Sequence, residues 1–446
     1  MIHDEPARGS VPPPWFWALS GFDRMRAFSD GLLPWPPLSR LTGMRMSHVD
    51  AGSTTWMMPA SNSLVGYGGL LDLTMLIETA LTGASLTTVA PGATVIPITL
   101  SINHFRVPRA APGNVIAQAR VVNSSSLFVF TEVRVQDPEG RPLAQGSSQA
   151  AIVPVTPPPP PPGSLQRVEE PSYATPDPYL RPTPTTVGRE RALDGMASGL
   201  EALRASLEGQ VRSPLANLFG LRDGFIEEGT VGVSMPASEW LCHFTRHVAP
   251  GALASLANMA GWMGALTIRP PGHWMAGLDL VVRFHGTVVP DGRSLHGVAS
   301  GVVPGSGNLV VSPVSVVDDD DRLLVTGSVA GVFVDTARRI ARPGQKAERV
   351  LTTILVTDIV SSSGHADRLG IRAGVHTGEA ELQDGDLAGL AVHIATRLEG
   401  QASAGEVVVS GTVKDLAIGS ALVFEHRGEH ELKGIPGTWQ VYAAGA

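Results

Sequence analysis

VRVQDPEGRPLAQGSSQAAIV (residues 133–153) and VSVVDDDDRLLVTGSVAGVFV (residues 314–334) align without a gap, and this repeat decides the fold. Each stretch predicts a strand, a tight acidic turn and a returning strand. The run DDDD matches DPEG in the other copy, which favours a solvated turn over a calcium site. We therefore interpret the first and second thirds of the chain as two copies of one domain. The shared positions include Val133 and Val314, Asp137 and Asp318, Arg141 and Arg322, and Gly146 and Gly327.

The same order of elements precedes the repeat in both copies. MPAS occurs at residues 58–61 and 235–238, and an apolar stretch long enough for a helix follows at residues 68–83 and 251–266. Alternating strands then lead to the predicted hairpin. One long helix followed by antiparallel strands is typical of the α+β class.

Composition narrows the classes of function. The 446 residues carry a net charge of -8, contain 43% hydrophobic residues and include one cysteine, Cys242. Without a basic patch we expect no nucleic-acid partner, and a lone cysteine suits a reducing bacterial cytoplasm. The first residues do not resemble a secretory signal. The uncharged runs 79–103 and 248–268 are broken by Pro, Gly, Ser or Thr. Each is therefore predicted to form a buried helix followed by a strand rather than a membrane-spanning segment, and we expect no membrane partner.

A proline-rich stretch, TPPPPPPG (residues 156–163), marks the clearest boundary. Such a stretch favours extended polyproline geometry and predicts a semi-rigid tether. The resulting division is an N-terminal extension (1–44), a first domain (45–155), a Pro-rich linker (156–212), a second domain (213–335) and a C-terminal domain (349–446).

The first copy carries a family resemblance. A glycine pair that opens the helical stretch, then ITLSINHFRVPRAAPGNVIAQARVV (residues 98–122) and the hairpin, resembles the hotdog fold of phenylacetate-pathway acyl-CoA thioesterases. The second copy is similar through GLDLVVRFHGTVV (residues 277–289). Hotdog domains pair side by side in that family, so the resemblance implies a double hotdog within one chain.

The resemblance also implies a catalytic site in the first copy. In the family, N–H groups at a glycine pair polarise the thioester carbonyl, and a carboxylate on the helix acts as base or nucleophile. Here Tyr67, Gly68 and Gly69 stand at the helix entry, where the family has His-Gly-Gly. Leu76 takes the position of the acid, which leaves Glu78 as the candidate base and Asp72 as a weaker candidate or a helix-dipole partner.

In the second copy, Asn258 stands seven residues after Gly251, where the family has its acid. An amide cannot act as a base, although it can orient water or hold a carbonyl, so Asn258 is a candidate in that role. His243 and His247 have spacing that could hold a metal, but packing histidines are the simpler interpretation. His104 and His285 are interpreted as strand residues.

From residue 349 the chain resembles the class III adenylate and guanylate cyclase domain, with RVLTTILVTDIVSSS (residues 349–363) as its first strand. The resemblance assigns Asp358, with Ile359 beside it, to a vestigial metal position, and His393 and Arg397 to a transition-state remnant. Only GHADRL (residues 364–369) separates this stretch from the next predicted strand, so the second metal carboxylate is missing. We expect a shortened ferredoxin-like scaffold without cyclase activity.

These expectations combine into one function with two alternatives. The first is hydrolysis of an acyl-CoA thioester without a cofactor. The alternatives are a non-catalytic acyl-CoA-binding sensor, and a cyclase regulated by an acyl ligand, which alone would need Mg²⁺ or Mn²⁺. Acyl-CoA is the expected small-molecule partner, and a homodimer is compatible with the resemblance.

Overall fold

The chain divides into two units, Met1–Asp335 (unit 1) and Thr336–Ala446 (unit 2), and each is described by itself. The computed structural model describes residues 2–67, 69–169, 171–182, 198–207, 213–305, 308–335, 348–361, 369–383, 386–388, 390–420, 422–432, 435 and 437–445. Gly68 lies outside these residues, and several strand and helix residues, among them Asp358 and Ile359, are described by their backbone alone.

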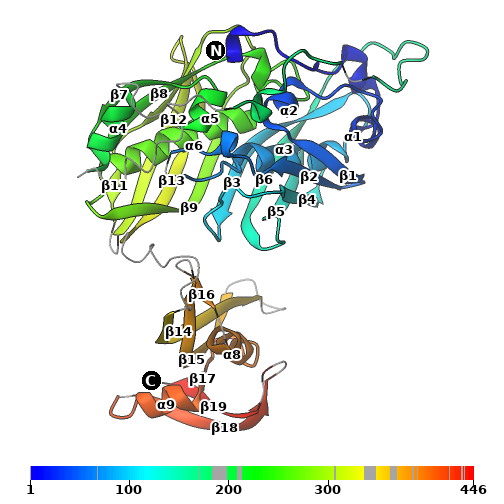
Figure 1. Ribbon diagram of the computed structural model, residues 1–446. Coiled ribbons are helices and arrows are strands. Elements are labelled where there is room, and N and C mark those ends of the chain that lie inside the picture. Colours follow the sequence, from blue (N-terminus) through cyan, green and yellow to red (C-terminus); the bar gives the residue numbers. More distant parts are fainter. Residues whose placement is uncertain are drawn as a thin grey trace. The chain divides into compact units, whose positions relative to one another are not determined.

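The described strands of unit 1 form one antiparallel sheet of 13 strands (Figure 1). The first copy contributes β1 (Arg45–Asp50), β2 (Ser53–Pro59), β3 (Ala93–His104), β4 (Asn114–Ser124), β5 (Phe128–Gln136) and β6 (Pro142–Pro154). The second contributes β7 (Arg222–Glu227), β8 (Thr230–Pro236), β9 (His273–Phe284), β10 (Ser294–Ala299), β11 (Val303–Pro304), β12 (Leu309–Asp318) and β13 (Leu323–Asp335).

The strands of the two copies follow the same order in the sheet. Read inward from one edge, the sheet runs β1-β2-β4-β5-β6-β3, and from the other edge β7-β8-β10-β12-β13-β9, with β11 beside β12. The two innermost strands, β3 and β9, pair antiparallel with Ser101 opposite Val281. Both copies therefore share one sheet, and the predicted α+β class is confirmed.

The two stretches that align in sequence form equivalent hairpins, β5–β6 and β12–β13. In each turn an aspartate, Asp137 or Asp318, accepts hydrogen bonds from the backbone N–H and the Nε of the arginine four residues later. Gly140 and Asp321 occupy the same turn position, with φ of 82° and 58°. This left-handed geometry closes a tight hairpin, so the acidic run is a turn, as predicted.

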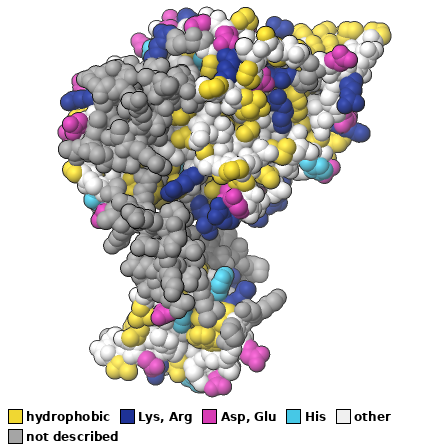
Figure 2. Space-filling view, viewed as in Figure 1, with side chains coloured by type: hydrophobic (Ala, Val, Ile, Leu, Met, Phe, Trp, Pro, Cys, Tyr) yellow, Lys and Arg dark blue, Asp and Glu magenta, His cyan; other side chains and the backbone are white. Residues whose placement is uncertain are grey.

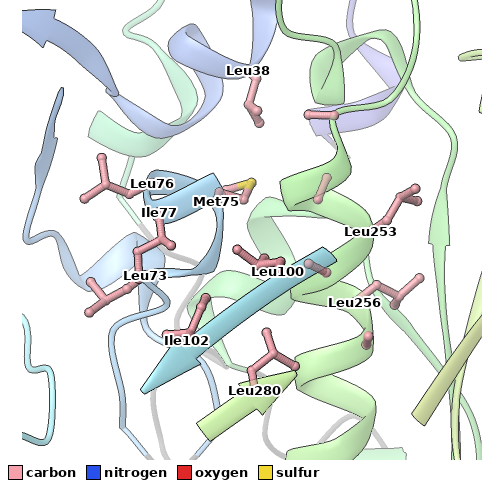
Figure 3. Close-up of a cluster of buried hydrophobic side chains, with 14 of the residues drawn as sticks. Leu38, Leu73, Met75, Leu76, Ile77, Leu100, Ile102, Leu253, Leu256 and Leu280 are labelled. Carbon is pink, nitrogen blue, oxygen red and sulfur yellow. The ribbon is translucent and has the colours of Figure 1, made fainter. Parts of the chain in front are cut away.

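Two long helices, α3 (Thr74–Leu86) and α6 (Pro250–Thr267), lie side by side on one face of the sheet (Figure 1). Every residue of α3 except Thr82 is buried, which suits a helix that is apolar all round. The core between helices and sheet includes Leu76, Leu100, Leu253 and Leu280 (Figure 3). The apolar runs thus form buried helix followed by strand, and no helix within the described ranges is long and apolar enough to cross a membrane.

Residues before β1 and between the two copies also pack on unit 1. Phe16 and Phe28 are fully buried, and the Asp177 carboxylate lies 3.2 Å from guanidinium nitrogens of both Arg8 and Arg40. The predicted linker therefore includes a packed segment. The elements are η1 (Ile2–Asp4), η2 (Pro14–Ala18), α1 (Gly21–Ser29), α2 (Pro37–Thr42), η3 (Asn62–Leu64), η4 (Pro178–Leu180), α4 (Gly199–Leu207), α5 (Pro214–Leu218) and η6 (Glu239–Leu241).

Unit 2 has a separate sheet in the order β14-β15-β17-β19-β18, with β16 beside β15. The elements are β14 (Glu348–Ser361), β15 (Leu369–Gln383), β16 (Asp386–Ala388), α8 (Leu390–Glu399), β17 (Val407–Ser410), α9 (Gly411–Leu416), β18 (Val423–Glu431) and β19 (Thr438–Gly445). β15 and β17 pair in parallel, and α8 lies in the crossover between them, as parallel pairing requires. The predicted order of strand, strand, helix, strand, short helix and hairpin is confirmed.

Candidate functional site

A partly enclosed hollow lies between the loop that precedes α3, the end of β3 and the middle of α6, and we call it the α3–α6 pocket. Its volume is about 50 Å³, several times the roughly 10–15 Å³ that one water molecule needs. Apolar side chains make up much of its wall, and a few polar groups converge on it, which is typical of small-molecule sites. The wall includes Tyr67, Leu71, Asp72, His104, Asn258 and Trp262.

Asp72 lies at the entry to α3. Its Oδ1 accepts a hydrogen bond of 2.8 Å from the backbone N–H of Thr74, which is in the first turn of the helix. Its Oδ2 is buried and has no hydrogen-bond partner within the described part of the chain. A buried carboxylate oxygen without a protein partner is costly, so it is suited to accept from a water or ligand in the pocket.

His104 is the last residue of β3 and lines the same pocket. Its Nδ1 is buried and has no hydrogen-bond partner among the described residues. Burial lowers the pKa of the imidazole below its ordinary value of 6.5, and the nearby Asp72 carboxylate offsets part of this decrease. The ring is therefore neutral at neutral pH and can accept a proton.

Asn258 reaches the pocket from the second copy. Its Nδ2 lies 3.5 Å from the Thr74 hydroxyl at the start of α3. An amide N–H here can donate to an oxygen of a bound molecule, but it cannot take up a proton. The pocket thus combines a carboxylate and an imidazole from the first copy with an amide from the second.

The entry to α3 differs from the prediction. The helix begins at Thr74 rather than at the glycine pair, and Gly69 lies in a turn with φ of 74°. The intervening backbone is held by other bonds, because Leu71 N–H donates to Pro108 and Asp72 N–H donates to Leu64. Gly69 therefore does not open the helix, and the first N–H of the helix, that of Thr74, donates to Asp72.

Glu78 lies on α3 but does not line the pocket. Its carboxylate is buried, accepts from the Thr82 hydroxyl at 2.6 Å, and accepts from the backbone N–H of Gly251 at 3.2 Å. Burial raises the pKa of Glu78 to about 7, and these two hydrogen bonds limit the increase. Glu78, the predicted base, therefore accepts a hydrogen bond from the first turn of α6 in the second copy.

Glu78 and Asn258 occupy equivalent positions on the helices of the two copies. Thr87 directly follows α3, and Thr267 is the last residue of α6. Each hydroxyl accepts from the N–H of the glycine between the first two strands of its copy. Nine residues before each threonine stand Glu78 and Asn258. Each helix thus sends a polar side chain to the start of the other helix, with an acid in one direction and an amide in the opposite one.

In the second copy, a side chain occupies the space inside the loop that corresponds to the pocket wall. Isolated bridges join Val65 to Leu71 and Cys242 to Val248 at equivalent positions. Inside the second loop, the His243 ring packs 5.5 Å from the Trp56 ring, and burial lowers its pKa to about 3. His243 is a packing residue in a loop, as the simpler interpretation predicted.

The candidates in unit 2 lie on two elements. Asp358 and Ile359 are in β14, opposite Arg372 and Ile371 of β15. His393 and Arg397 are exposed on α8, four residues apart. In the described ranges of both units, no group of three or more His, Cys, Asp or Glu is placed to hold a metal ion. The vestigial metal and transition-state assignments stay predictions.

Surface charge gives no second candidate on the visible face of unit 1. Basic and acidic side chains alternate there among apolar and neutral ones (Figure 2). This mixed pattern differs from the clustered basic face of nucleic-acid-binding proteins.

Comparison with known proteins gives structural but not sequence relatives. No family model and no curated protein matches the chain. A TesB protein of Mycobacterium avium subspecies paratuberculosis is 15% identical, with 67% of this chain and 98% of that chain covered and a TM-score of 0.41. A hotdog-fold protein of unknown function from Alicyclobacillus acidocaldarius is 14% identical (69% and 98% covered, TM-score 0.39). A thioesterase family protein from Silicibacter pomeroyi is 17% identical (31% and 98% covered, TM-score 0.26). The chain is thus similar, at low identity, to hotdog-fold and thioesterase structures.

Proposed function

We propose that unit 1 is a double hotdog that binds an acyl thioester of coenzyme A in the α3–α6 pocket and hydrolyses it. One observation carries this proposal: Asp72, His104 and Asn258, from three elements of two copies, line one hollow. The same hollow has apolar walls that suit an acyl group. The proposed hydrolysis uses water as the nucleophile and involves no cofactor.

In this proposal His104 is the general base. It takes a proton from water as the water oxygen attacks the thioester carbonyl carbon, and the Asp72 charge stabilises the imidazolium that forms. The amide N–H of Asn258 donates to the oxygen that becomes negative. The carbon–sulfur bond then breaks, and the thiolate takes the proton back from His104. The products are a carboxylic acid and a free thiol.

A second candidate function is binding of the acyl thioester without turnover. The observation that favours it concerns two equivalent positions: Asn258, an amide, lines the pocket, whereas Glu78, the acid, does not and accepts from Gly251. An acyl-CoA sensor would retain the pocket and lack an efficient base. Unit 2, which we propose to be a shortened relative of the class III cyclase domain, would then be its output domain.

Thiol release from a panel of acyl-CoA esters tests the proposal. If His104 is the base, His104→Ala lowers kcat/KM by about 100- to 10,000-fold. His285→Ala is the matched control, because this exposed histidine follows the equivalent strand β9 and bonds to Thr326 outside the pocket. Glu78→Gln retains turnover on this account, and loss of turnover in that variant alone would make Glu78 the base instead.

Acyl-CoA binding without thiol release in the natural chain would favour the second candidate. Asn258→Asp then becomes informative, since it introduces a carboxylate beside the start of α3. Thiol release that appears only in this variant would show that the pocket binds the thioester and lacks a base. If the natural chain neither binds nor cleaves any acyl-CoA, both candidate functions are wrong.

A further inference from the structure

Trp262 forms one wall of the α3–α6 pocket. It follows Asn258 by four residues on α6, slightly more than one helical turn or about 6 Å along the axis, and both side chains line the hollow. The indole is partly buried and packs against the core of unit 1. The pocket therefore extends along α6 from the polar group at Asn258 to a large apolar ring.

The indole ring of Trp262 packs against the backbone of β9 at Gly277, which has no side chain. A Cβ built on Gly277 would lie 2.8 Å from Cζ2 of Trp262, closer than side chains approach one another. Gly277 also lines the pocket, opposite Gly331 of β13. Because position 277 has no side chain, the ring can occupy this space, and a larger residue there would push it toward the hollow.

The remaining apolar wall leaves little room for rearrangement. Leu71 and Leu73, from the entry to α3, are 2% and 1% exposed, and Met259 of α6 is 6% exposed. The hollow that they enclose with Trp262 is about 50 Å³, enough for a few water molecules. A short acyl group fits such a space, whereas a long chain meets the indole.

We propose that Trp262, held on Gly277, determines the acyl-chain length that this pocket accepts and restricts it to short acyl groups. This inference rests on the proposed function, since it assigns a substrate class to the same site. Contact with the Gly277 backbone on one side and with the core of unit 1 on the other limits the positions that the ring can take.

The test compares chain-length profiles for acyl-CoA esters from acetyl to palmitoyl. We expect kcat/KM of the natural chain to fall beyond a few carbon atoms. Trp262→Ala should raise kcat/KM for longer esters by about tenfold or more, the discrimination that even one methylene produces in an apolar pocket, and Trp262→Phe should give a smaller gain. Gly277→Ala should act in the opposite direction and lower kcat/KM for all but the shortest esters.

Trp274→Ala is the control, because Trp274 is on β9 but does not line the pocket. Its chain-length profile should equal that of the natural chain. Thermal unfolding of each variant identifies any that fails to fold, and Trp262→Phe, which retains an aromatic ring, then replaces Trp262→Ala in the comparison. Binding of non-cleavable thioether analogues of the same acyl-CoA series, measured by calorimetry, gives a second profile that does not depend on turnover.

The outcomes separate this inference from the proposed function. Turnover or binding with a profile that Trp262→Ala and Trp262→Phe leave unchanged would refute the role of Trp262 and leave the function standing. Binding of thioether analogues that shifts to longer chains, without thiol release, would support the role of Trp262 and refute hydrolysis. If no variant binds or cleaves any member of the series, both are wrong.

Discussion

Replacement of Glu78 by glutamine should change how the stability of the protein depends on pH. Burial raises the pKa of this carboxyl from 4.5 to about 7 in the folded chain. A difference of this size corresponds to about 3 kcal/mol of unfolding free energy. Because the folded pKa is the higher one, this stability is fully present below pH 4.5 and is lost as the pH rises through about 7.

Glu78→Gln cannot ionise. Its one acceptor oxygen can take the hydrogen bond from the Gly251 N–H, and its NH2 group can donate to the Thr82 hydroxyl, which now accepts. The measured quantity is the unfolding free energy of Glu78→Gln minus that of the natural chain. This difference should increase by about 3 kcal/mol from roughly pH 4.5 to pH 8, because only the natural chain loses stability over this range. Urea unfolding at a series of pH values measures this difference through tryptophan fluorescence, since seven of the eight tryptophans precede residue 336. Glu139→Gln, in the exposed turn of the β5–β6 hairpin, is the control and should change the free energy by at most about 0.5 kcal/mol at any pH.

The refuting result is a constant difference between Glu78→Gln and the natural chain from about pH 5 to about pH 8. It would mean that Glu78 ionises equally easily in the folded and unfolded states. The raised pKa of Glu78 would then be wrong, and with it the conclusion that burial at the start of α6 disfavours the ionised carboxylate.

Three further predictions concern other parts of the chain. Asp137→Ala should lower the unfolding free energy by about 2 kcal/mol, because the bonds from Arg141 that close the hairpin are lost; an unchanged melting temperature would contradict this. Asp177→Ala should cost about 3 kcal/mol, because Arg8 and Arg40 lose their shared partner, whereas Asp177→Asn should cost less; equal losses in thermal unfolding would show that the charge is unimportant. Incubation with ATP or GTP and Mn²⁺ should give no cyclic nucleotide by chromatography, and product above background would restore the cyclase hypothesis.

Local patterns were sufficient to predict most of the architecture. Alternating strands around an acidic turn predicted both hairpins, because strand alternation and turn chemistry act over a few neighbouring residues. The apolar runs predicted α3 and α6 as buried helices that lead into β3 and β9. The gapless repeat predicted two copies of one arrangement, and the strands of the two copies follow the same order in the sheet.

The start of α3 was harder to predict. The glycine pair indicated a helix from residue 68, yet the helix begins at Thr74. Its preceding backbone pairs with Leu64 and Pro108, which are set in place by tertiary packing. Hydrogen bonds of this kind have no local signature, so the helix boundary could not be read from propensity alone.

The candidate site depends still more on tertiary structure. Asp72 and His104 are 32 positions apart, and sequence reasoning assigned His104 only to a strand. The one available signal was a titratable residue at the last position of a mostly apolar strand, the kind of place where sites are often built. Proximity of Asp72 to His104 follows only from the fold.

The sequence by itself determined two copies of an α+β domain, their hairpins and their buried helices, because periodicity, turn residues and repetition are properties of short segments. Only the tertiary structure decided that Glu78 accepts a hydrogen bond from Gly251 in the second copy, whereas Asn258 lines the pocket. The pairing of β3 with β9 brings the two helices together, and that contact joins residues more than a hundred positions apart. Burial then assigns different roles to two equivalent positions: an acid that stabilises a helix start, and an amide beside a hollow.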